Sequence, residues 1–142
     1  MNFNIARDYS PYTGLRHSIN SELSGEDFYH KKLNSAFAEA LQNQEKLFLE
    51  LDGSLDGYAP SFLDEAIGNL VYDFGLEVVK SNLVIKSERE SQWIVMIEQQ
   101  TFPNWAKRRK DKDIPTVTEQ HSAWYRLVNG ELKLKIWCSP NK

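Results

Sequence analysis

The sequence predicts a single α/β domain in which a small mixed β-sheet carries helices in βαβ order and a C-terminal antiparallel β-hairpin follows. Two observations predict the α/β body. Short apolar runs alternate with helical patterns, and the segments between these runs are long enough to let neighbouring strands pair in parallel. A third observation predicts the hairpin, because Asn129-Gly130 separates two alternating strands. The 142 residues suffice to bury one hydrophobic core.

The first predicted elements are two short strands, over residues 3–6 and 15–19, joined by a turn that contains proline and glycine. Together they suggest an opening β-hairpin. A helix is predicted over residues 24–43, because Ser24-Gly-Glu-Asp27 is similar to a capping box and apolar side chains then recur at helical spacing.

The middle of the chain predicts a core strand followed by a buried helix. Residues 47–51, Leu-Phe-Leu-Glu-Leu, form a short apolar run that is typical of a central strand buried on both faces. After a loop over residues 52–60, apolar residues at steps of one and four predict a helix over residues 62–74 that ends at Gly75.

The remaining elements alternate in the same way before the hairpin. Residues 83–86 predict another strand, and Ser87-Glu-Arg-Glu90 predicts a capping box that opens the next helix. Phe102-Pro103 should end that helix, because proline breaks a helix interior. The hairpin over residues 123–137 should extend or cover the sheet of the body, since an isolated hairpin is marginal in water.

Charge is divided unevenly along the chain. Residues 1–100, the α/β body, contain 8 Lys or Arg and 16 Asp or Glu, whereas residues 101–142 contain 9 and 4. An acidic body therefore precedes a basic segment and hairpin, which we expect to pack on the same domain. The only cysteine, Cys138, has no disulfide partner, and no stretch approaches the ~20 apolar residues of a spanning helix. These observations predict a cytoplasmic protein with no membrane partner.

Several segments resemble a known family. The strand ending in LELDG, the irregular loop and PSFLDEAIGNLV are similar to the strand, loop and helix of STAS domains, the fold of anti-sigma factor antagonists. The resemblance is closer to a STAS-like domain family of unknown function found in bacteria and their mobile elements. DYSPYTGLR and SGEDFYHKKLNSAFAEAL also resemble that family. The resemblance covers residues 5–98 and leaves the C-terminal segment outside.

The resemblance implies a regulatory domain that binds a protein partner and has no enzymatic activity. In STAS antagonists a serine at the start of this helix is phosphorylated by a partner kinase, and Ser61 is the position that matches. The chain reads Tyr58-Ala-Pro-Ser61-Phe62 where those proteins have an Asp-Ser-Ser-Gly type of motif. The resemblance also implies partner switching with a GHKL-type ATPase or kinase, and it places recognition around Tyr58, Ser61, Phe62 and Asp64.

Ser61 has two interpretations. As the N-cap of the helix it would accept a hydrogen bond from the backbone amide of Asp64, and this explains the serine without any function. As a phosphate acceptor it would gain from the helix dipole, although Asp64 and Glu65 in the first turn would repel the added charge. The capping interpretation is favoured, because serine is among the residues preferred at that position.

Residues that could support catalysis or bind a metal are few. The carboxylates Asp52, Asp56 and Asp64 could be placed around Mg²⁺, but Asp-Gly pairs are ordinary in turns. The three histidines lie far apart in the sequence without metal-ligand spacing, and no nucleophile-elbow motif supports a hydrolase. The histidines are His17, His30 and His121. The sequence therefore predicts no metal, no cofactor and no enzyme.

The C-terminal segment supplies an alternative function, a small nucleic-acid-binding regulator. Its cations lie close in the sequence to three tryptophans and a tyrosine, a mixture that suits single-stranded nucleic acid. The cations are Lys107, Arg108, Arg109 and Lys110. The competing interpretation is a solvated basic segment over an acidic body, with the tryptophans packed beneath it. That interpretation is favoured, because an acidic body repels phosphates.

Overall fold

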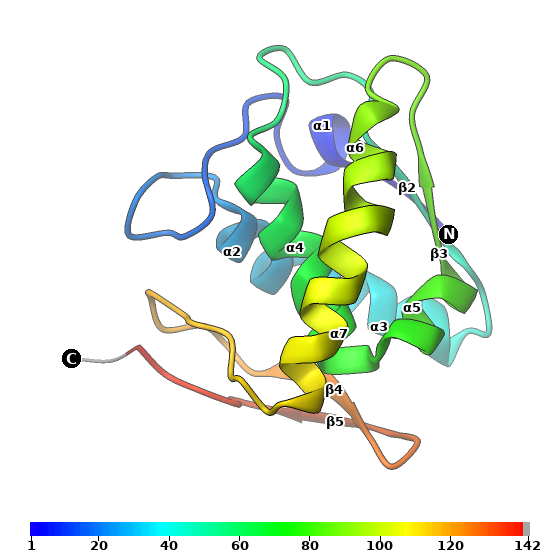
Figure 1. Cartoon of the computed structure of the whole chain (residues 1–142), viewed down its shortest axis with the longest axis vertical. Coiled ribbons are helices and arrows are strands. Elements are labelled where there is room, and N and C mark those ends of the chain that lie inside the picture. Colours follow the sequence, from blue (N-terminus) through cyan, green and yellow to red (C-terminus); the bar gives the residue numbers. More distant parts are fainter. Residues whose placement is uncertain (141–142) are drawn as a thin grey trace.

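The computed structural model describes residues 1–140 and shows an α/β fold with a three-stranded sheet and a separate two-stranded hairpin (Figure 1). The strands of the sheet are β1 (Asn2–Asn4), β2 (Leu47–Glu50) and β3 (Leu83–Lys86), and they lie side by side in that order. Both strand pairs are parallel, so the predicted mixed sheet is wrong for this sheet. Within residues 1–140 the only antiparallel pairing is in the hairpin.

Strand β2 lies at the centre of the sheet, as predicted, but it is buried on one face only. Leu47 and Leu49 are fully buried, whereas Phe48 and Glu50 on the opposite face keep partial contact with solvent. The prediction of burial on both faces is wrong, because the helices pack against the leucine face and leave the other face partly open.

The predicted opening hairpin does not form. After β1 the chain turns into a short helix, α1 (Ile5–Asp8), because the Asn4 side chain accepts a hydrogen bond from the amide of Arg7 and caps that turn. The segment predicted as a second strand is an irregular loop instead. Its carbonyl groups at Leu15 and Arg16 accept hydrogen bonds from the next helix start, so they have no strand partner.

The helix predicted over residues 24–43 is confirmed, with one irregular turn. It consists of α2 (Gly25–Phe28), a π-helical turn η1 (Tyr29–Leu33) and α3 (Asn34–Gln42). The Ser24 side chain caps its start by accepting from the amide of Asp27 at 3.0 Å.

Helix α4 (Pro60–Phe74) is the most buried helix of the domain and ends at Gly75, as predicted. Gly75 has a φ of 88°, a conformation that glycine adopts without strain. The N-cap, however, is Ala59, and Ser61 is the second helical residue, so the predicted capping role of Ser61 is wrong. The reason is Pro60, whose fixed φ and missing amide suit the first helical position.

A short helix, α5 (Leu76–Asn82), leads from α4 to β3. The last helical segment consists of α6 (Gln92–Met96), a second π-helical turn η2 (Ile97–Thr101) and α7 (Phe102–Lys110). Pro103 does not end this segment, contrary to the prediction. Proline disrupts a regular helix because it lacks an amide and its ring meets the preceding turn. Here it lies at the start of α7, directly after the wider π turn.

The hairpin consists of β4 (Trp124–Val128) and β5 (Glu131–Lys135), as predicted from Asn129-Gly130. Both turn residues have positive φ, as a two-residue hairpin turn requires. The hairpin does not extend the three-stranded sheet. Strand β4 lies against α3 and α4 instead, and the Asn34 side chain both donates to and accepts from the backbone of Tyr125.

Helix α7 packs closely on α4. The indole of Trp105 lies so close to Gly68 that even a methyl group there would overlap the ring. Trp105 is almost fully buried, so this part of the C-terminal segment belongs to the same hydrophobic core as the body. Among the helices of residues 1–140, none is long and apolar enough to cross a membrane.

Candidate functional site

Two of the residues predicted to face a partner lie in the core. Phe62 is fully buried and stacks on Phe28. Tyr58 is also buried, and its hydroxyl donates to the carbonyl of Leu51 at 2.7 Å. Burial raises the pKa of that hydroxyl well above its ordinary value. Both side chains therefore hold the loop before α4 in place, and neither is available to a partner.

Asp64, the third predicted residue, connects α4 with two other parts of the chain. Its carboxylate accepts from Arg16 at 2.8 Å, from the Thr101 hydroxyl at 2.8 Å and from the Trp105 indole at 3.2 Å. Ser61 and Asp64 are both partly exposed, but the Ser61 side chain makes no hydrogen bond to any residue of 1–140. Among the four predicted residues, Ser61 is therefore the one that combines partial exposure with an unpaired side chain.

The carboxylate of Asp52, one of the three possible Mg²⁺ ligands, holds the turn that follows β3. It accepts from the Ser87 hydroxyl and from the amides of Glu88 and Arg89, which follow β3. The Ser87 hydroxyl in turn accepts from the amide of Glu90, so the predicted capping box forms a turn here. Helix α6 begins only at Gln92.

Exposed apolar side chains occur in two loops, one between α1 and α2 and the other after β2. Tyr12, Leu15 and Leu55 are 52%, 50% and 66% exposed. The two loops are joined, because the amide of Leu55 donates to the carbonyl of Pro11 at 2.9 Å. We call these three side chains, together with Ser61, the edge surface.

The edge surface is anchored to the start of α4. The carbonyl of Leu15 accepts from the amide of Gly25, and Gly25 lies directly against the backbone of Phe62. The next residue, Arg16, binds Asp64 and Glu65. These contacts place the loop beside Ser61 and limit its movement.

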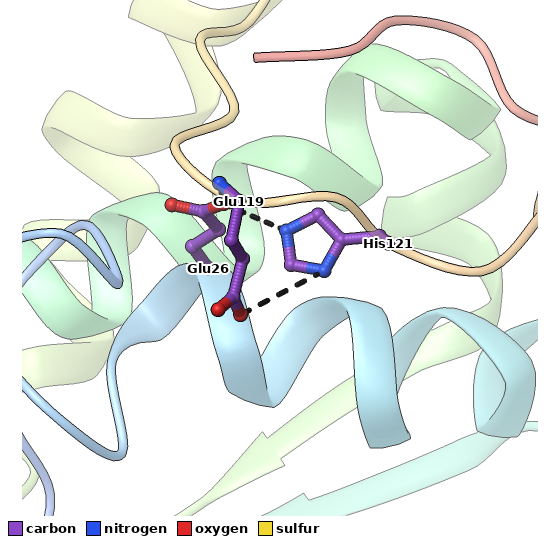
Figure 2. A group of neighbouring side chains, drawn as sticks. All are labelled: Glu26, Glu119 and His121. Carbon is purple, nitrogen blue, oxygen red and sulfur yellow. Dashed lines mark hydrogen bonds and ion pairs between the residues drawn. The ribbon is translucent and has the colours of Figure 1, made fainter.

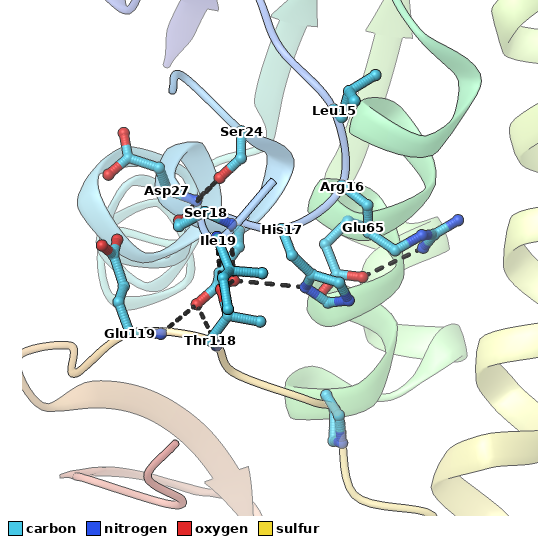
Figure 3. A network of polar contacts seen from close by, with 12 residues as sticks. Leu15, Arg16, His17, Ser18, Ile19, Ser24, Asp27, Glu65, Thr118 and Glu119 are labelled. Carbon is cyan, nitrogen blue, oxygen red and sulfur yellow. Dashed lines mark hydrogen bonds and ion pairs between the residues drawn. The ribbon is translucent and has the colours of Figure 1, made fainter. Parts of the chain in front are cut away.

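A second group of functional side chains surrounds Glu26, which sequence reasoning did not single out. Glu26 is almost fully buried at the start of α2. One carboxylate oxygen accepts from the amide of Ser18 and the hydroxyl of Thr118; the other accepts from the amide of Thr118 and from His121 at 2.7 Å. Figure 3 shows Ser18, Thr118 and Glu119 close together at this place. One buried glutamate therefore fixes a loop of the body and the segment between α7 and β4.

Glu26 is ionised because its partners outweigh its burial. Burial by itself would raise its pKa, but the hydrogen bonds from His121, Thr118 and the backbone amide of Ser18 lower the pKa well below the ordinary value. These contacts therefore favour the charged carboxylate.

All three histidines gather at this glutamate, although they are far apart in the sequence. His17 Nδ1 lies 3.4 Å from the Glu26 carboxylate, and His121 donates to it. The His30 ring stacks on His121, with centroids 3.8 Å apart. Burial, followed by the nearby His121, lowers the pKa of His30 to about 3, so His30 is neutral. No sequence spacing signals this cluster, because folding alone brings the three together.

A third polar group attaches the hairpin to α4. Asp73, fully buried, accepts from the Tyr29 hydroxyl and from Arg126 of β4 at 2.7 Å. The guanidinium of Arg126 also lies over the rings of Tyr72 and Trp137. Burial raises the pKa of Asp73, and the charge of Arg126 opposes that shift.

The basic segment considered for nucleic-acid binding is used largely within the protein. Arg108 lies over the Trp105 ring and donates to the carbonyl of Ile114, while Arg109 donates to the carbonyl of Tyr72. Lys107 forms an exposed ion pair with Asp111. Trp105 and Trp124 are buried, so their rings are not available for base stacking.

Comparison with known proteins identifies the domain. Residues 24–93 match the family described as a STAS-like domain of unknown function (DUF4325). Residues 24–93 of this chain are therefore similar to a STAS-like domain. The match is shorter than the predicted resemblance over residues 5–98 and excludes the whole C-terminal segment. No curated protein and no solved structure matches the chain.

Proposed function

We propose that this protein is a non-enzymatic regulatory domain that binds a partner protein through the edge surface, and that phosphorylation of Ser61 weakens this binding. One observation carries the proposal. Three exposed apolar side chains lie on two loops joined by a backbone hydrogen bond, and one of these loops leads directly into the start of α4, where Ser61 is partly exposed. The STAS-like family supports the regulatory part of the proposal.

The position of the edge surface suits recognition. In α/β sheets, ligands bind outside the carboxyl ends of the strands, where the loops after β1 and β2 lie (Figure 1). Neighbouring exposed apolar side chains are typical of an interaction site, because they gain free energy when a partner removes them from water. The hydrogen bonds that join and anchor the loops reduce the entropy that binding would cost.

The surroundings of Ser61 favour an added phosphate more than the sequence suggested. The dipole at the start of α4 attracts an anion. Asp64 and Glu65 are the acidic side chains nearest in the helix, and both form ion pairs with Arg16, at 2.8 and 3.2 Å. Their repulsion of a phosphate is thereby reduced.

The proposed partner is a GHKL-type ATPase or kinase, by similarity to the partners of STAS antagonists. Such a partner would both bind the edge surface and phosphorylate Ser61. The phosphate would then add charge to an apolar interface, where its desolvation is unfavourable.

Leu55→Asp is expected to weaken the partner complex at least tenfold, because it places a charge in the apolar part of the edge surface. The partner would be captured in the natural host by crosslinking, identified, purified and titrated against each variant. Leu134→Asp on β5 is the matched control, since Leu134 is 55% exposed and lies on the hairpin. If only the control weakens binding, the interface lies on the hairpin and the edge surface is excluded.

Ser61→Asp and Ser61→Ala are expected to have the same urea midpoint of unfolding as wild type, because the Ser61 side chain makes no capping hydrogen bond at the start of α4. With the purified partner, Ser61→Asp should bind more weakly and Ser61→Ala should bind as wild type does. Mass spectrometry of the protein from its natural host should find phosphate on Ser61. Equal binding by both variants, together with an unmodified Ser61, would exclude phosphorylation of Ser61 as a switch. The location of the interface would still be decided by the Leu55→Asp experiment.

A further inference from the structure

We infer that His121 and Glu119 form a binding site for a divalent transition-metal ion such as Zn²⁺, with Glu26 orienting the histidine from behind. Its two ligands lie in the segment between α7 and β4, outside the residues that match the STAS-like family, whereas Glu26 lies in α2, inside them. It does not involve the edge surface, and it does not depend on the proposed partner binding.

The two nitrogens of His121 face two different carboxylates (Figure 2). Nε2 lies 2.7 Å from Glu26, so it carries the proton and donates it to that carboxylate. Nδ1 makes no hydrogen bond to residues 1–140 and lies 4.0 Å from Glu119 Oε1. Metal-binding histidines have this arrangement, in which a carboxylate holds one nitrogen and leaves the lone pair of the other for the metal.

Glu119 can supply the second ligand. Its side chain is 46% exposed, and its carboxylate accepts no hydrogen bond from residues 1–140. Zinc bonds to nitrogen and oxygen are about 2.0–2.1 Å long, so two ligand atoms at a tetrahedral angle lie roughly 3.3 Å apart. The observed 4.0 Å therefore needs only a small movement of an exposed side chain. The other coordination positions would hold water, for which Glu119 borders a cavity of about 400 Å³.

Glu26 is near enough to be counted as a third ligand, but its bonding assigns it another role. Both of its oxygens already accept hydrogen bonds, including two from Thr118. Coordination would break these bonds and leave buried donors unpaired, which is unfavourable. His30 is also excluded, since its ring is stacked nearly parallel on His121 and the two rings do not converge on one point.

The local charge favours a cation. Glu26, Asp27 and Glu119 supply three carboxylates, whereas the nearest lysine, Lys31, is already paired with Asp27 at 2.8 Å. An imidazole nitrogen with a carboxylate oxygen suits Zn²⁺ better than Mg²⁺ or Ca²⁺, which prefer oxygen ligands alone.

The test is calorimetric titration of the full chain with ZnCl₂ at pH 7.5, in a buffer that does not bind zinc. We expect one ion per chain, and we expect Glu119→Gln to weaken binding at least tenfold without changing the circular dichroism spectrum. Glu22→Gln is the matched control, because Glu22 is an exposed acid bordering the same cavity and is not part of the metal-binding group. It should bind zinc as wild type does.

A second measurement identifies the atom that binds. Nitrogen-15 NMR of the histidine rings should show a zinc-induced shift of His121 Nδ1, with His17 and His30 little changed. Absence of binding, equal affinity of Glu119→Gln and wild type, or a shift centred on His17 or His30 would each overturn the assignment.

Discussion

A chain shortened to residues 1–100 is expected not to fold. The deletion removes Trp105 and Trp124, which are buried in the core. It also leaves buried carboxylates of the body, Glu26 and Asp73 above all, without their C-terminal partners. Leaving a buried charge unpaired costs ~3–5 kcal/mol, and a domain of this size has a total stability of roughly 5–15 kcal/mol.

Far-ultraviolet circular dichroism and binding of a hydrophobic dye would test this expectation. The shortened chain should lack a cooperative thermal transition and should bind the dye. A chain ending at residue 138 is the control, because it keeps the hairpin and Cys138, and it should unfold as the full chain does. Cooperative unfolding of a monomeric 1–100 fragment would show that the C-terminal segment is an accessory to an independent domain.

Glu26→Gln is expected to lower the free energy of unfolding by about 3 kcal/mol or more at pH 7. The amide of glutamine has one oxygen and a donor group, whereas the site presents donors from Ser18, Thr118 and His121 to both oxygens. The new donor would therefore face existing donors in a buried place. Urea unfolding followed by tryptophan fluorescence measures the change. Glu119→Gln, next to the same site, should change the free energy by less than about 0.5 kcal/mol.

The difference in unfolding free energy between wild type and Glu26→Gln should also depend on pH and should decrease at low pH. The pKa of Glu26 in the folded state lies well below its unfolded value, so its ionised form is stabilised by folding. Its contribution is complete above the unfolded pKa of about 4.3 and is lost as pH falls below it towards the folded pKa. The difference in unfolding free energy should therefore be smaller at pH 3.5 than at pH 5.

The difference in unfolding free energy between wild type and Glu26→Gln separates the effect of Glu26 from pH effects of the opposite sign. Burial raises the pKa values of Asp73 and Glu65, so these two groups favour folding less as pH rises through their range. Both are present in the two proteins and cancel in the difference. A difference that grew towards low pH would contradict the role assigned to Glu26.

Much of the fold could be predicted because its signals are local. The Ser24 cap, the end of α4 at Gly75 and the Asn129-Gly130 turn each depend on residues within one turn of the chain, and each is confirmed. The predictions of helix boundaries failed where an adjacent residue or turn determines the structure. Pro103 is accommodated by a preceding π turn, and Pro60 rather than Ser61 determines where α4 begins.

The polar sites could not be predicted in the same way. Glu26 attracted attention only as part of a helix start, yet its main partner, His121, is 95 residues away. The sequence spacing of the histidines is not that of metal ligands, but that spacing says nothing about distances in the folded chain. Tyr58 and Phe62 were placed on the surface by family resemblance, although their rings fill the core.

The attachment of the hairpin has a consequence for synthesis of the protein in the cell. Strand β4 inserts against α3 and α4, and Asn34 bonds to Tyr125 across 91 residues. During translation the first hundred residues leave the ribosome before these partners exist. The nascent domain must therefore wait, with its apolar helices unpaired, until the hairpin emerges. Folding of the domain is then a late event, and the interval before it is when chaperones and proteases have access to the chain.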